Sequence, residues 1–398
     1  MTGLGRYFES ELLDEQDTSF LVFDLAQLGS RLQSLAAAFP AGTRHAIAIK
    51  TNPHPAVLSF MVDEGFALEA ASMEELELAL NAGATPGNIV FDSPVKTRAE
   101  IERCAGEFPG LLLNANSLAE LDRLPDEHGL RVGLRINPQV RAAEDPLYDV
   151  SSNRSKFGVS IHEPGLVEAC VRQGVSGLHM HVGSGAVNGE AHLQALQDML
   201  QLAGQVDAAL QESGRPGLAF LDIGGGLSAE ADTHGMARYG AAVGELLAGK
   251  GLEVWTEFGH WVHHDAGSAC SRIEYLRQPV DGAPGMAYLH LGADFMVRQV
   301  YHARKRLGCA VFDPEGHPRR GAEMPYDLVG PLCFAGDVLA EGTMLADPCE
   351  GDWIRFEAMG ANTFGLWSRH CSRTIPKVIL QHPDGTLTLG SPRTSVAP

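Results

Sequence analysis

The feature that most constrains the fold is a series of eight short, mostly apolar runs that recur through the first two thirds of the chain. They span residues 45–50, 67–72, 88–91, 111–115, 132–137, 177–182, 220–225 and 253–259. The first five begin 21 to 23 residues apart, an interval that fits one strand, one helix and two short loops. The segments between them have the pattern of amphipathic helices. In one of these, Ser72 is expected to cap the helix with Glu75 as its capping-box partner.

Apolar strands that alternate with helices indicate a parallel sheet that is covered on both faces. Eight such units predict an α/β fold built on a closed (β/α)8 barrel of the TIM type. An open doubly wound sheet is the alternative, although it rarely needs eight similar units. The barrel is expected to span residues 24–262.

After residue 262 the pattern changes to short β-prone runs, which are separated by turn residues and accompanied by few helices. The runs are 267–276, 286–291, 326–329, 337–340, 353–356, 377–380 and 386–389. They predict a C-terminal β-sandwich or β-barrel domain. The apolar run from Phe20 to Phe23 precedes the first barrel strand and is expected to join this domain, which then comprises residues 1–23 and 263–398.

Composition narrows the range of partners. The chain has 398 residues and a formal net charge of -20, and such an acidic protein is a poor match for nucleic acid or an anionic membrane. The sequence contains neither a long apolar run nor a signal-peptide pattern. Its 7 cysteines include no CxxC pair, which predicts free thiols in a reducing cytoplasm. We therefore expect a cytoplasmic protein that binds neither nucleic acid nor membrane.

In a barrel of this kind the catalytic residues lie at the carboxyl ends of the strands. Here those ends carry Lys50, Glu69, Ser72, Asn114, Arg135, Asn137, His181, Gly224 to Gly226 and Glu257. Each one alone has an ordinary structural interpretation, but so many polar or glycine ends at one rim indicate a functional site. Burial at a strand end is expected to lower the pKa of Lys50, and a free amine can form a Schiff base with an aldehyde.

These residue types suit pyridoxal 5′-phosphate (PLP). The glycine triplet 224–226 offers backbone N–H groups to a phosphate. Glu257 could keep the pyridine nitrogen protonated, and His181 could supply a flat ring for stacking. A glycine triplet alone is a weak signal, whereas the order lysine, histidine, glycine triplet and Glu-x-Gly is far more specific.

The chain resembles the fold-type III PLP-dependent decarboxylases, the family of diaminopimelate and ornithine decarboxylases. The similar segments are AIKTNP (48–53), EAAS (69–72), LRINP (134–138), SKFG (155–158), LHMHVGS (178–184), DIGGG (222–226), EFGH (257–260), GPLCFAGD (330–337) and GANT (360–363). They follow the family order from about residue 18 to 380, and together they are highly specific.

The resemblance implies a role for each matching residue. Lys50 would hold PLP as a Schiff base, Glu257 would pair with the pyridine nitrogen, and His181 would stack on the ring. Other cofactor-binding positions would be Glu69, Arg135, Ser184, Gly224, Gly225, Gly226, Gly259, His260 and Asn362. Cys333 would return a proton to the substrate after carbon dioxide leaves. In the family this cysteine segment reaches into the partner subunit, which implies a homodimer with shared active sites.

Three positions depart from the family pattern. His260 and Asn362 stand where the family has an arginine and a tyrosine that help to hold the phosphate. Phe334 stands where the family has an acidic residue that binds a distal amine. An ammonium group buried there without a carboxylate would lose several kcal/mol, while cation–π attraction returns only about 0.5–2 kcal/mol. Lysine, ornithine and diaminopimelate are therefore disfavoured as substrates.

A basic cluster from Arg298 to Arg306 lies in a region that the family uses for substrate contact. Arg298, His302, Phe334 and Asp337 are accordingly the expected substrate-binding residues. They predict a substrate with a neutral or anionic far end, as in the siderophore-biosynthesis branch of the family. The alternative interpretation of the basic cluster is a solvated surface helix.

Other functions stay open at this point. A decarboxylase of diaminopimelate or another diamino acid is one alternative, and a fold-type III amino-acid racemase is another. A catalytically inactive regulator with the same fold is a third. The retention of Lys50, His181, Glu257 and Cys333 favours a PLP-dependent amino-acid decarboxylase, and we expect no metal ion in the site.

Overall fold

The structure is a computed structural model, and it describes residues 3–142, 148–185, 189–229, 231–301 and 307–394. The chain divides into two compact units. Gly29–Val262 form the barrel unit, whereas Met1–Leu28 and His263–Pro398 form the β unit. The domain limits of 24–262 and of 1–23 with 263–398 remain predictions from the sequence.

The barrel unit contains a closed circle of eight parallel strands. They are β2 (Arg44–Ala48), β3 (Ala67–Ala70), β4 (Ile89–Phe91), β5 (Leu112–Ala115), β6 (Arg131–Asn137), β8 (Gly177–Met180), β9 (Phe220–Asp222) and β10 (Glu253–Thr256). The pairing of β10 with β2 and of β5 with β6 completes the circle. The predicted (β/α)8 barrel is thus confirmed, and the open doubly wound sheet is wrong. The short β7 (Val159–Ser160) pairs with β6 outside the circle.

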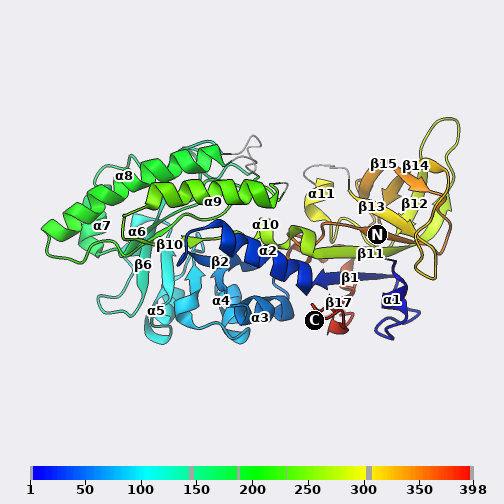
Figure 1. The fold of residues 1–398 in the computed structure, drawn as a ribbon, viewed down its shortest axis with the longest axis horizontal. Coiled ribbons are helices and arrows are strands. Elements are labelled where there is room, and N and C mark those ends of the chain that lie inside the picture. Colours follow the sequence, from blue (N-terminus) through cyan, green and yellow to red (C-terminus); the bar gives the residue numbers. More distant parts are fainter. Residues whose placement is uncertain (1–2, 143–147, 186–188, 230, 302–306, 395–398) are drawn as a thin grey trace. The chain divides into compact units, whose positions relative to one another are not determined.

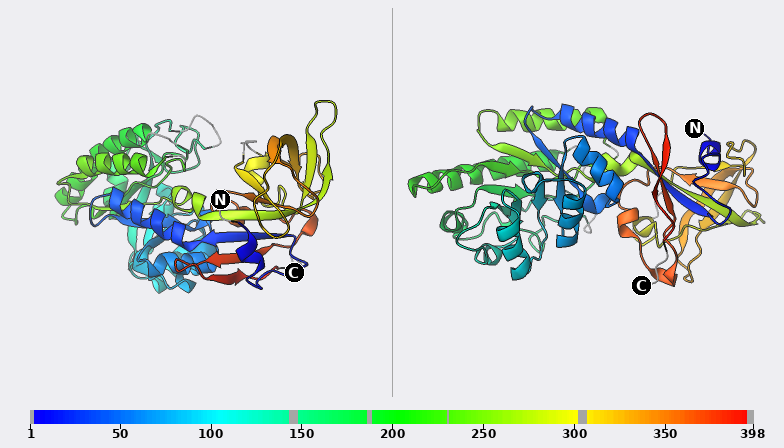
Figure 2. Two further views of the ribbon diagram at one scale, coloured as in Figure 1. Left: turned by 45° about the vertical axis from the view of Figure 1, so that its right-hand side comes forward. Right: turned by 90° about the horizontal axis from the view of Figure 1, so that it is seen from below.

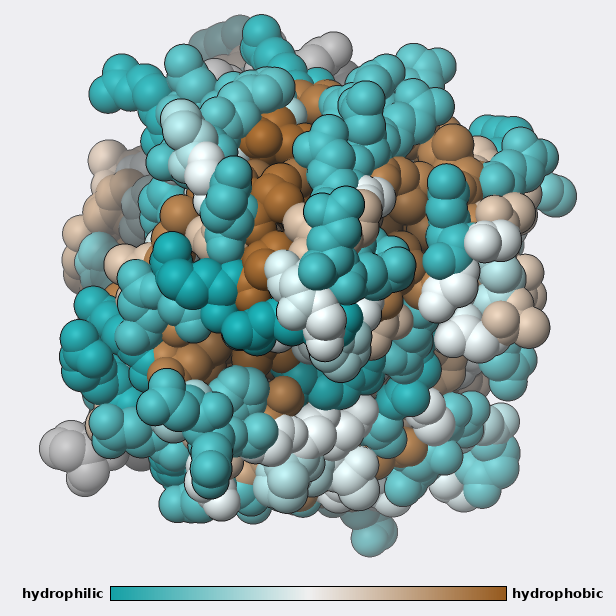
Figure 3. Space-filling model, turned by 90° about the vertical axis from the view of Figure 1, so that its left-hand side faces the viewer, coloured by the Kyte–Doolittle hydropathy of each residue, from teal (hydrophilic) through white to brown (hydrophobic). Residues whose placement is uncertain are grey.

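Helices follow most of the strands and cover the barrel. They are α2 (Leu25–Ala38), α3 (Pro55–Asp63), α4 (Met73–Asn81), α5 (Arg98–Glu107), α6 (Leu118–Leu121), α7 (Leu166–Gln173), α8 (Glu190–Glu212) and α9 (Thr233–Leu247). The long α8 and α9 lie side by side in both Figure 1 and Figure 2. The face drawn in Figure 3 carries mostly hydrophilic side chains with hydrophobic areas between them. Among the described residues, no helix combines the length and apolarity that a membrane crossing requires.

The start of α4 confirms one expected cap and corrects its partner. The Ser72 hydroxyl accepts a hydrogen bond from the Glu75 N–H at 3.1 Å, as predicted. The Glu75 carboxylate, however, accepts from the N–H of Ala71 at 2.7 Å and not from that of Ser72. This hydrogen bond connects α4 to the loop after β3 at Ala71, which is one residue before the N-cap residue whose N–H a capping box would use.

Bulky aromatic rings fill part of the barrel interior. Trp255 on β10 and Phe220 on β9 are fully buried and pack with smaller apolar residues of the neighbouring strands. Space for the Phe220 ring comes from Gly177 on β8, since a Cβ atom there would lie 2.4 Å from the ring. The apolar pattern of the strands does not reveal this pairing of a large ring with a missing side chain, because it depends on the register between β8 and β9.

The β unit is built on one nine-stranded sheet that contains β1 (Ser19–Asp24). The other strands are β11 (Gly267–Arg277), β12 (Gly285–Leu289), β13 (Cys309–Phe312), β14 (Glu323–Val329), β15 (Val338–Ala346), β16 (Trp353–Phe356), β17 (Lys377–Gln381) and β18 (Leu387–Ser391). β1 pairs antiparallel with β11 and parallel with β17, which confirms that the run from Phe20 to Phe23 belongs here. Sequence reasoning missed β13, although its apolar run CAVF carries a usable signal.

Candidate active site

Lys50 lies just beyond the first barrel strand, in the short 3-10 helix η1 (Ile49–Thr51). About half of its side-chain surface is exposed, and its ammonium nitrogen contacts Oε2 of Glu69. Glu69 is fully buried on β3, and its backbone pairs with that of Ala48. The parallel register therefore brings the lysine amine and this carboxyl to one end of the barrel.

The expected depression of the Lys50 pKa is wrong. Partial loss of hydration acts against the charged amine, but attraction to the carboxyls of Glu69, Asp92 and Glu257 outweighs it and raises the pKa of Lys50 above its ordinary value. The carboxylates come from three other strands, so the pattern around the lysine itself could not reveal them. An amine with a raised pKa is an ammonium group near pH 7.

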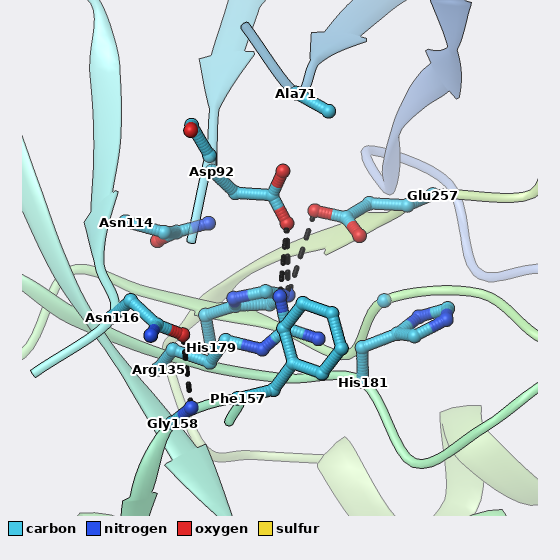
Figure 4. Close-up of polar contacts among 12 residues, drawn as sticks. Ala71, Asp92, Asn114, Asn116, Arg135, Phe157, Gly158, His179, His181 and Glu257 are labelled. Atoms are coloured by element: carbon cyan, nitrogen blue, oxygen red, sulfur yellow. Dashed lines mark hydrogen bonds and ion pairs between the residues drawn. The ribbon is translucent and has the colours of Figure 1, made fainter. Parts of the chain in front are cut away.

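Asp92, which sequence reasoning missed, lies at the centre of the cluster in Figure 4. It follows β4 directly and is only 6% exposed. Its Oδ2 lies 3.6 Å from the guanidinium of Arg135 and 4.0 Å from Nε2 of His179. The usable signal was its position, because it is the first residue after the third apolar run and thus at the same rim as the predicted residues.

Glu257 follows β10 and is also buried, at 5% exposure. Its Oε1 lies 3.5 Å from Nε2 of His179 (Figure 4). Burial, together with the negative charge of Asp92, raises the pKa of Glu257 to about 8. Burial lowers the pKa of His179 to about 4, so this imidazole is neutral near pH 7. Glu257 therefore lies in a low-dielectric setting where a cationic partner would stabilise its ionised form.

His181 is fixed by the glycine loop that follows β9. Its Nδ1 accepts a hydrogen bond from the N–H of Gly225 at 3.1 Å. Loss of hydration and the nearby cations Arg135 and Lys50 hold the pKa of His181 well below its ordinary value. The ring is therefore neutral, and because its Nδ1 is an acceptor its proton is on Nε2.

The loop itself requires glycine. Gly224 and Gly226 have φ values of 64° and 110°, which L side chains rarely adopt. A Cβ atom at Gly226 would also lie 1.8 Å from the carbonyl oxygen of Gly183. The segment after β9 therefore packs directly against the segment after β8, with no side chain between the two backbones. Backbone N–H groups in such a glycine-rich turn are the type of group that binds phosphate.

The remaining predicted residues of the barrel unit lie in the segments that follow their strands. Gly259 packs against the Lys50 segment, since a Cβ atom there would lie 2.6 Å from Cγ2 of Thr51. His260 begins α10 (His260–His263), and the Ser184 N–H donates to the carbonyl of Tyr148 at 3.3 Å.

Another group of predicted residues belongs to the β unit. Cys333 is exposed there, and the neighbouring Phe334 ring is stacked with two other rings. Its centroid lies 5.5 Å from that of Tyr301 and 6.1 Å from that of His370. The Asp337 carboxylate accepts 2.7 Å hydrogen bonds from two backbone N–H groups of its own unit.

Asn362 is buried with φ of 57°, and Arg298 lies in the short helix α11 (Val297–Tyr301). Within the described part of the basic cluster, this helix with no buried residue agrees with the alternative interpretation of a solvated surface helix. The predicted substrate-binding residue His302 and the rest of the cluster through Arg306 lie outside the described residues.

The residues of the barrel rim fit a pyridoxal phosphate. The set comprises a primary amine, a buried acid whose Oε1 has no hydrogen-bond donor among the described residues, a neutral flat ring and a glycine cradle. Each group suits a different part of PLP. The amine suits its aldehyde, the acid its ring nitrogen, the flat ring its aromatic face and the glycine cradle its phosphate. The fold and this rim together define a PLP-binding barrel.

Comparison with known proteins agrees with this assignment. Residues 25–263 match the family model described as pyridoxal-dependent decarboxylase, pyridoxal binding domain. The chain is 30% identical over 379 residues to a diaminopimelate decarboxylase of Pseudomonas aeruginosa, covering 92% of this chain and 88% of that one. It is 26% identical over 388 residues to the diaminopimelate decarboxylase of Helicobacter pylori, covering 93% and 91%. This protein therefore belongs to the pyridoxal-dependent decarboxylase family.

Solved structures confirm the fold. The crystal structure of Helicobacter pylori diaminopimelate decarboxylase complexed with L-lysine matches with a TM-score of 0.84 and 23% identity, covering 98% of this chain and 97% of that chain. Lysine/ornithine decarboxylase from Vibrio vulnificus, complexed with cadaverine, matches with a TM-score of 0.77 and 22% identity, covering 94% and 97%. With the family established, the protein is a PLP-dependent carboxy-lyase that acts on an amino acid.

Proposed function

We propose that this decarboxylase acts on an amino acid, or an amino-acid conjugate, whose far end is neutral or anionic, and that it serves carboxylate siderophore biosynthesis. The observation that carries the proposal is the position of Phe334, one residue after Cys333. Its ring is stacked with Tyr301 and His370, so an apolar side chain is held where the family resemblance implies a carboxylate. A distal ammonium group would have no partner at this residue, and an unpaired buried charge outweighs several good apolar contacts.

The residues of the barrel rim would bind and orient the cofactor. Lys50 would hold it covalently, Glu257 would stabilise a proton on its ring nitrogen, and His181 would cover one ring face. Ser184, Gly224 to Gly226 and Gly259 would bind its phosphate, with His260 and Asn362 at the positions of the family's arginine and tyrosine. When bound, PLP supplies an electron sink for the bond to the departing carboxylate.

The β unit would provide the proton that completes the reaction. Cys333 is exposed, and its Sγ would donate a proton to the carbon that has lost carbon dioxide. Arg298, with His302 and Asp337, would contribute to substrate binding. The family resemblance places the cysteine segment in the barrel of a second subunit, so we include a homodimer with shared active sites in the proposal.

A decarboxylase of diaminopimelate is the second candidate function. The specific observation that favours it is the 30% identity to a diaminopimelate decarboxylase over 92% of this chain. Under this alternative the distal amine must find an acid other than residue 334.

The test that separates the two candidates is carbon dioxide release across a substrate panel. The ratio kcat/KM should be higher for carboxylate-bearing or citryl-conjugated amino acids than for lysine, ornithine and diaminopimelate. A diamino acid as the best substrate of the unmodified enzyme would reject the proposal and favour the second candidate.

The shared site has its own test. Lys50→Ala and Cys333→Ala subunits should each be inactive, and mixing them should restore part of the activity, because one hybrid site then contains both residues. A lack of recovery after subunit exchange has been verified by mass spectrometry would count against shared sites.

A further inference from the structure

His179 is a fully buried imidazole for which sequence reasoning gave no role. It lies on β8, and its backbone pairs with that of Arg135 on β6 and with that of Asp222 on β9. The parallel register therefore places His179 in a row between a cation and an acid, near the carboxyl ends of three neighbouring strands.

The Nε2 atom of His179 faces two further carboxyls. It lies 3.5 Å from Oε1 of Glu257 and 4.0 Å from Oδ2 of Asp92 (Figure 4). Within the described residues, neither nitrogen of this ring has a hydrogen-bond partner, and the same is true of Glu257 Oε1. Buried polar groups without partners are costly, and the shorter distance exceeds an ordinary N–H···O hydrogen bond by only about 0.5 Å. A small rotation of the Glu257 carboxyl would close it.

Asp222, the backbone neighbour of His179, has donors of its own. Its Oδ1 accepts a hydrogen bond from the N–H of Gly224 at 3.0 Å, and its Oδ2 accepts one from the side-chain amide of Asn114 at 3.3 Å. Asp222 is thus satisfied without the imidazole, which leaves Nε2 of His179 to the other two carboxyls.

The surroundings also favour one position for the ring proton. The guanidinium of Arg135 lies 3.6 Å from Oδ2 of Asp92, and such a close cation favours the ionised form of this carboxyl. Burial lowers the pKa of His179 to about 4, so the ring carries a single proton near pH 7. A ring lone pair directed at a carboxylate would be repelled, whereas an N–H group would be attracted. We therefore expect the proton on Nε2.

We propose that His179 is a positioning residue, whose Nε2–H holds Oε1 of Glu257 and orients this carboxyl toward the cofactor's ring nitrogen. The inference rests on the proposed role of Glu257 and adds a residue to it. Hydrogen bonds to the carbonyl of Gly224 at 2.8 Å and from the N–H of Gly259 at 3.0 Å hold the backbone of Glu257. They do not fix its carboxyl, because the terminal torsion of a glutamate is broad.

The contact with His179 is compatible with a second partner for Glu257. A carboxylate oxygen has two lone pairs, so Oε1 can accept from the imidazole and still face the ring nitrogen. A donated hydrogen bond also favours the ionised form of Glu257, which is the form that pairs with a protonated ring nitrogen. His179 thus acts on the cofactor through Glu257 and does not need to touch it.

The position of the ring proton is measurable in the apoenzyme. Nitrogen-15 NMR of labelled histidines reports which ring nitrogen is protonated, and loss of a signal in His179→Gln assigns it. The proposal requires a proton on Nε2 near pH 7. A proton on Nδ1 alone would overturn it, because Nε2 could then only accept and could not hold an ionised carboxylate.

Two variants separate positioning from packing. His179→Gln can place an amide N–H near the former Nε2, whereas His179→Leu fills the space without a donor. With nitrogen-15-labelled PLP bound, the pKa of the ring nitrogen should fall by about one unit in the leucine variant, with kcat about tenfold lower and KM little changed. The glutamine variant should retain most of both values. A leucine variant equal to the unmodified enzyme would overturn the proposal. If leucine prevents folding, as judged by circular dichroism, His179→Asn replaces it, because its shorter amide ends before the position of Nε2.

A double variant tests whether His179 acts through Glu257. In a Glu257→Gln background, His179→Leu should lower kcat little further, since no carboxylate is left to orient. An equal loss in both backgrounds would assign His179 a structural role and overturn the proposal. The proposed function fails separately, on the substrate panel or through a ring nitrogen that is unprotonated in the unmodified enzyme. A ring nitrogen protonated alike in the unmodified enzyme and in His179→Leu would reject the inference alone.

Discussion

The barrel unit and the β unit carry their candidate functional residues in different ways. In the barrel unit the side chains of Glu69, Asp92 and Glu257 are buried at strand ends, where charges from several strands alter their pKa values. In the β unit Cys333 is exposed, and Phe334 is held by ring stacking. The difference teaches where to look for each property: the barrel rim contains the residues that fit the cofactor, whereas the β unit contains the residues that we propose to distinguish one substrate from another.

The largest expected effect comes from the barrel unit. Lys50→Ala should reduce turnover by about 10³-fold or more, because the covalent attachment of PLP is lost. Borohydride reduction followed by mass spectrometry should place the pyridoxyl group on Lys50 in the unmodified protein. The exposed Lys156, which follows the fifth barrel strand, serves as the control, and Lys156→Ala should retain the adduct. An adduct on Lys96 or Lys156 would contradict the assignment.

Glu257→Ala should have the next largest effect. We expect PLP to bind, as followed by its absorbance, while turnover falls by roughly 10²- to 10³-fold because a preorganised charge at the ring nitrogen is missing. Turnover equal to that of the unmodified enzyme would exclude the role of Glu257.

Stability of the apoenzyme should depend on pH through the same residue. The pKa of Glu257 is raised from 4.5 to about 8, so the neutral form stabilises the fold below pH 4.5 and this contribution is lost as the pH rises through 8. Relative to Glu257→Gln, which cannot ionise, the unfolding free energy should fall by up to about 1.4 kcal/mol per pH unit in this window. Urea unfolding between pH 5 and 8 measures the difference, and parallel curves for the two proteins would refute it.

The smallest expected effect tests the β unit. Phe334→Glu restores an acid beside Cys333 and should shift the kcat/KM ratio toward diamino acids by about tenfold, which corresponds to about 1.4 kcal/mol. Phe334→Leu keeps the position apolar and should leave the preference unchanged. If the glutamate variant shows no gain in kcat/KM for lysine, ornithine or diaminopimelate, residue 334 does not select the substrate. The proposed assignment of substrate selection to the β unit would then lose its main support.

Much of the barrel was predictable because its signals are local. Short apolar runs with helical segments between them specify strands and helices wherever they occur, and eight of them fit a closed barrel. The glycine triplet 224–226 was readable only together with the lysine, the histidine and Glu-x-Gly around it in chain order. The positive φ values of Gly224 and Gly226 came from the structure. In the β unit β13 was missed although its run CAVF is apolar, because a four-residue run alone does not separate a strand from other buried segments. Its pairing with β16 identifies it as a strand.

The sequence by itself determined the order of the barrel strands, the position of Lys50 near the carboxyl end of the first of them and the residues available at the rim. Only the tertiary structure decided what those residues do to each other. Lys50 has a raised pKa because three carboxyls approach it from other strands. Two of them, Glu69 and Asp92, reach the same end of the barrel because β3 and β4 pair in parallel register. Ionisation depends on charges within a few ångströms, and folding brings those charges together from distant parts of the chain.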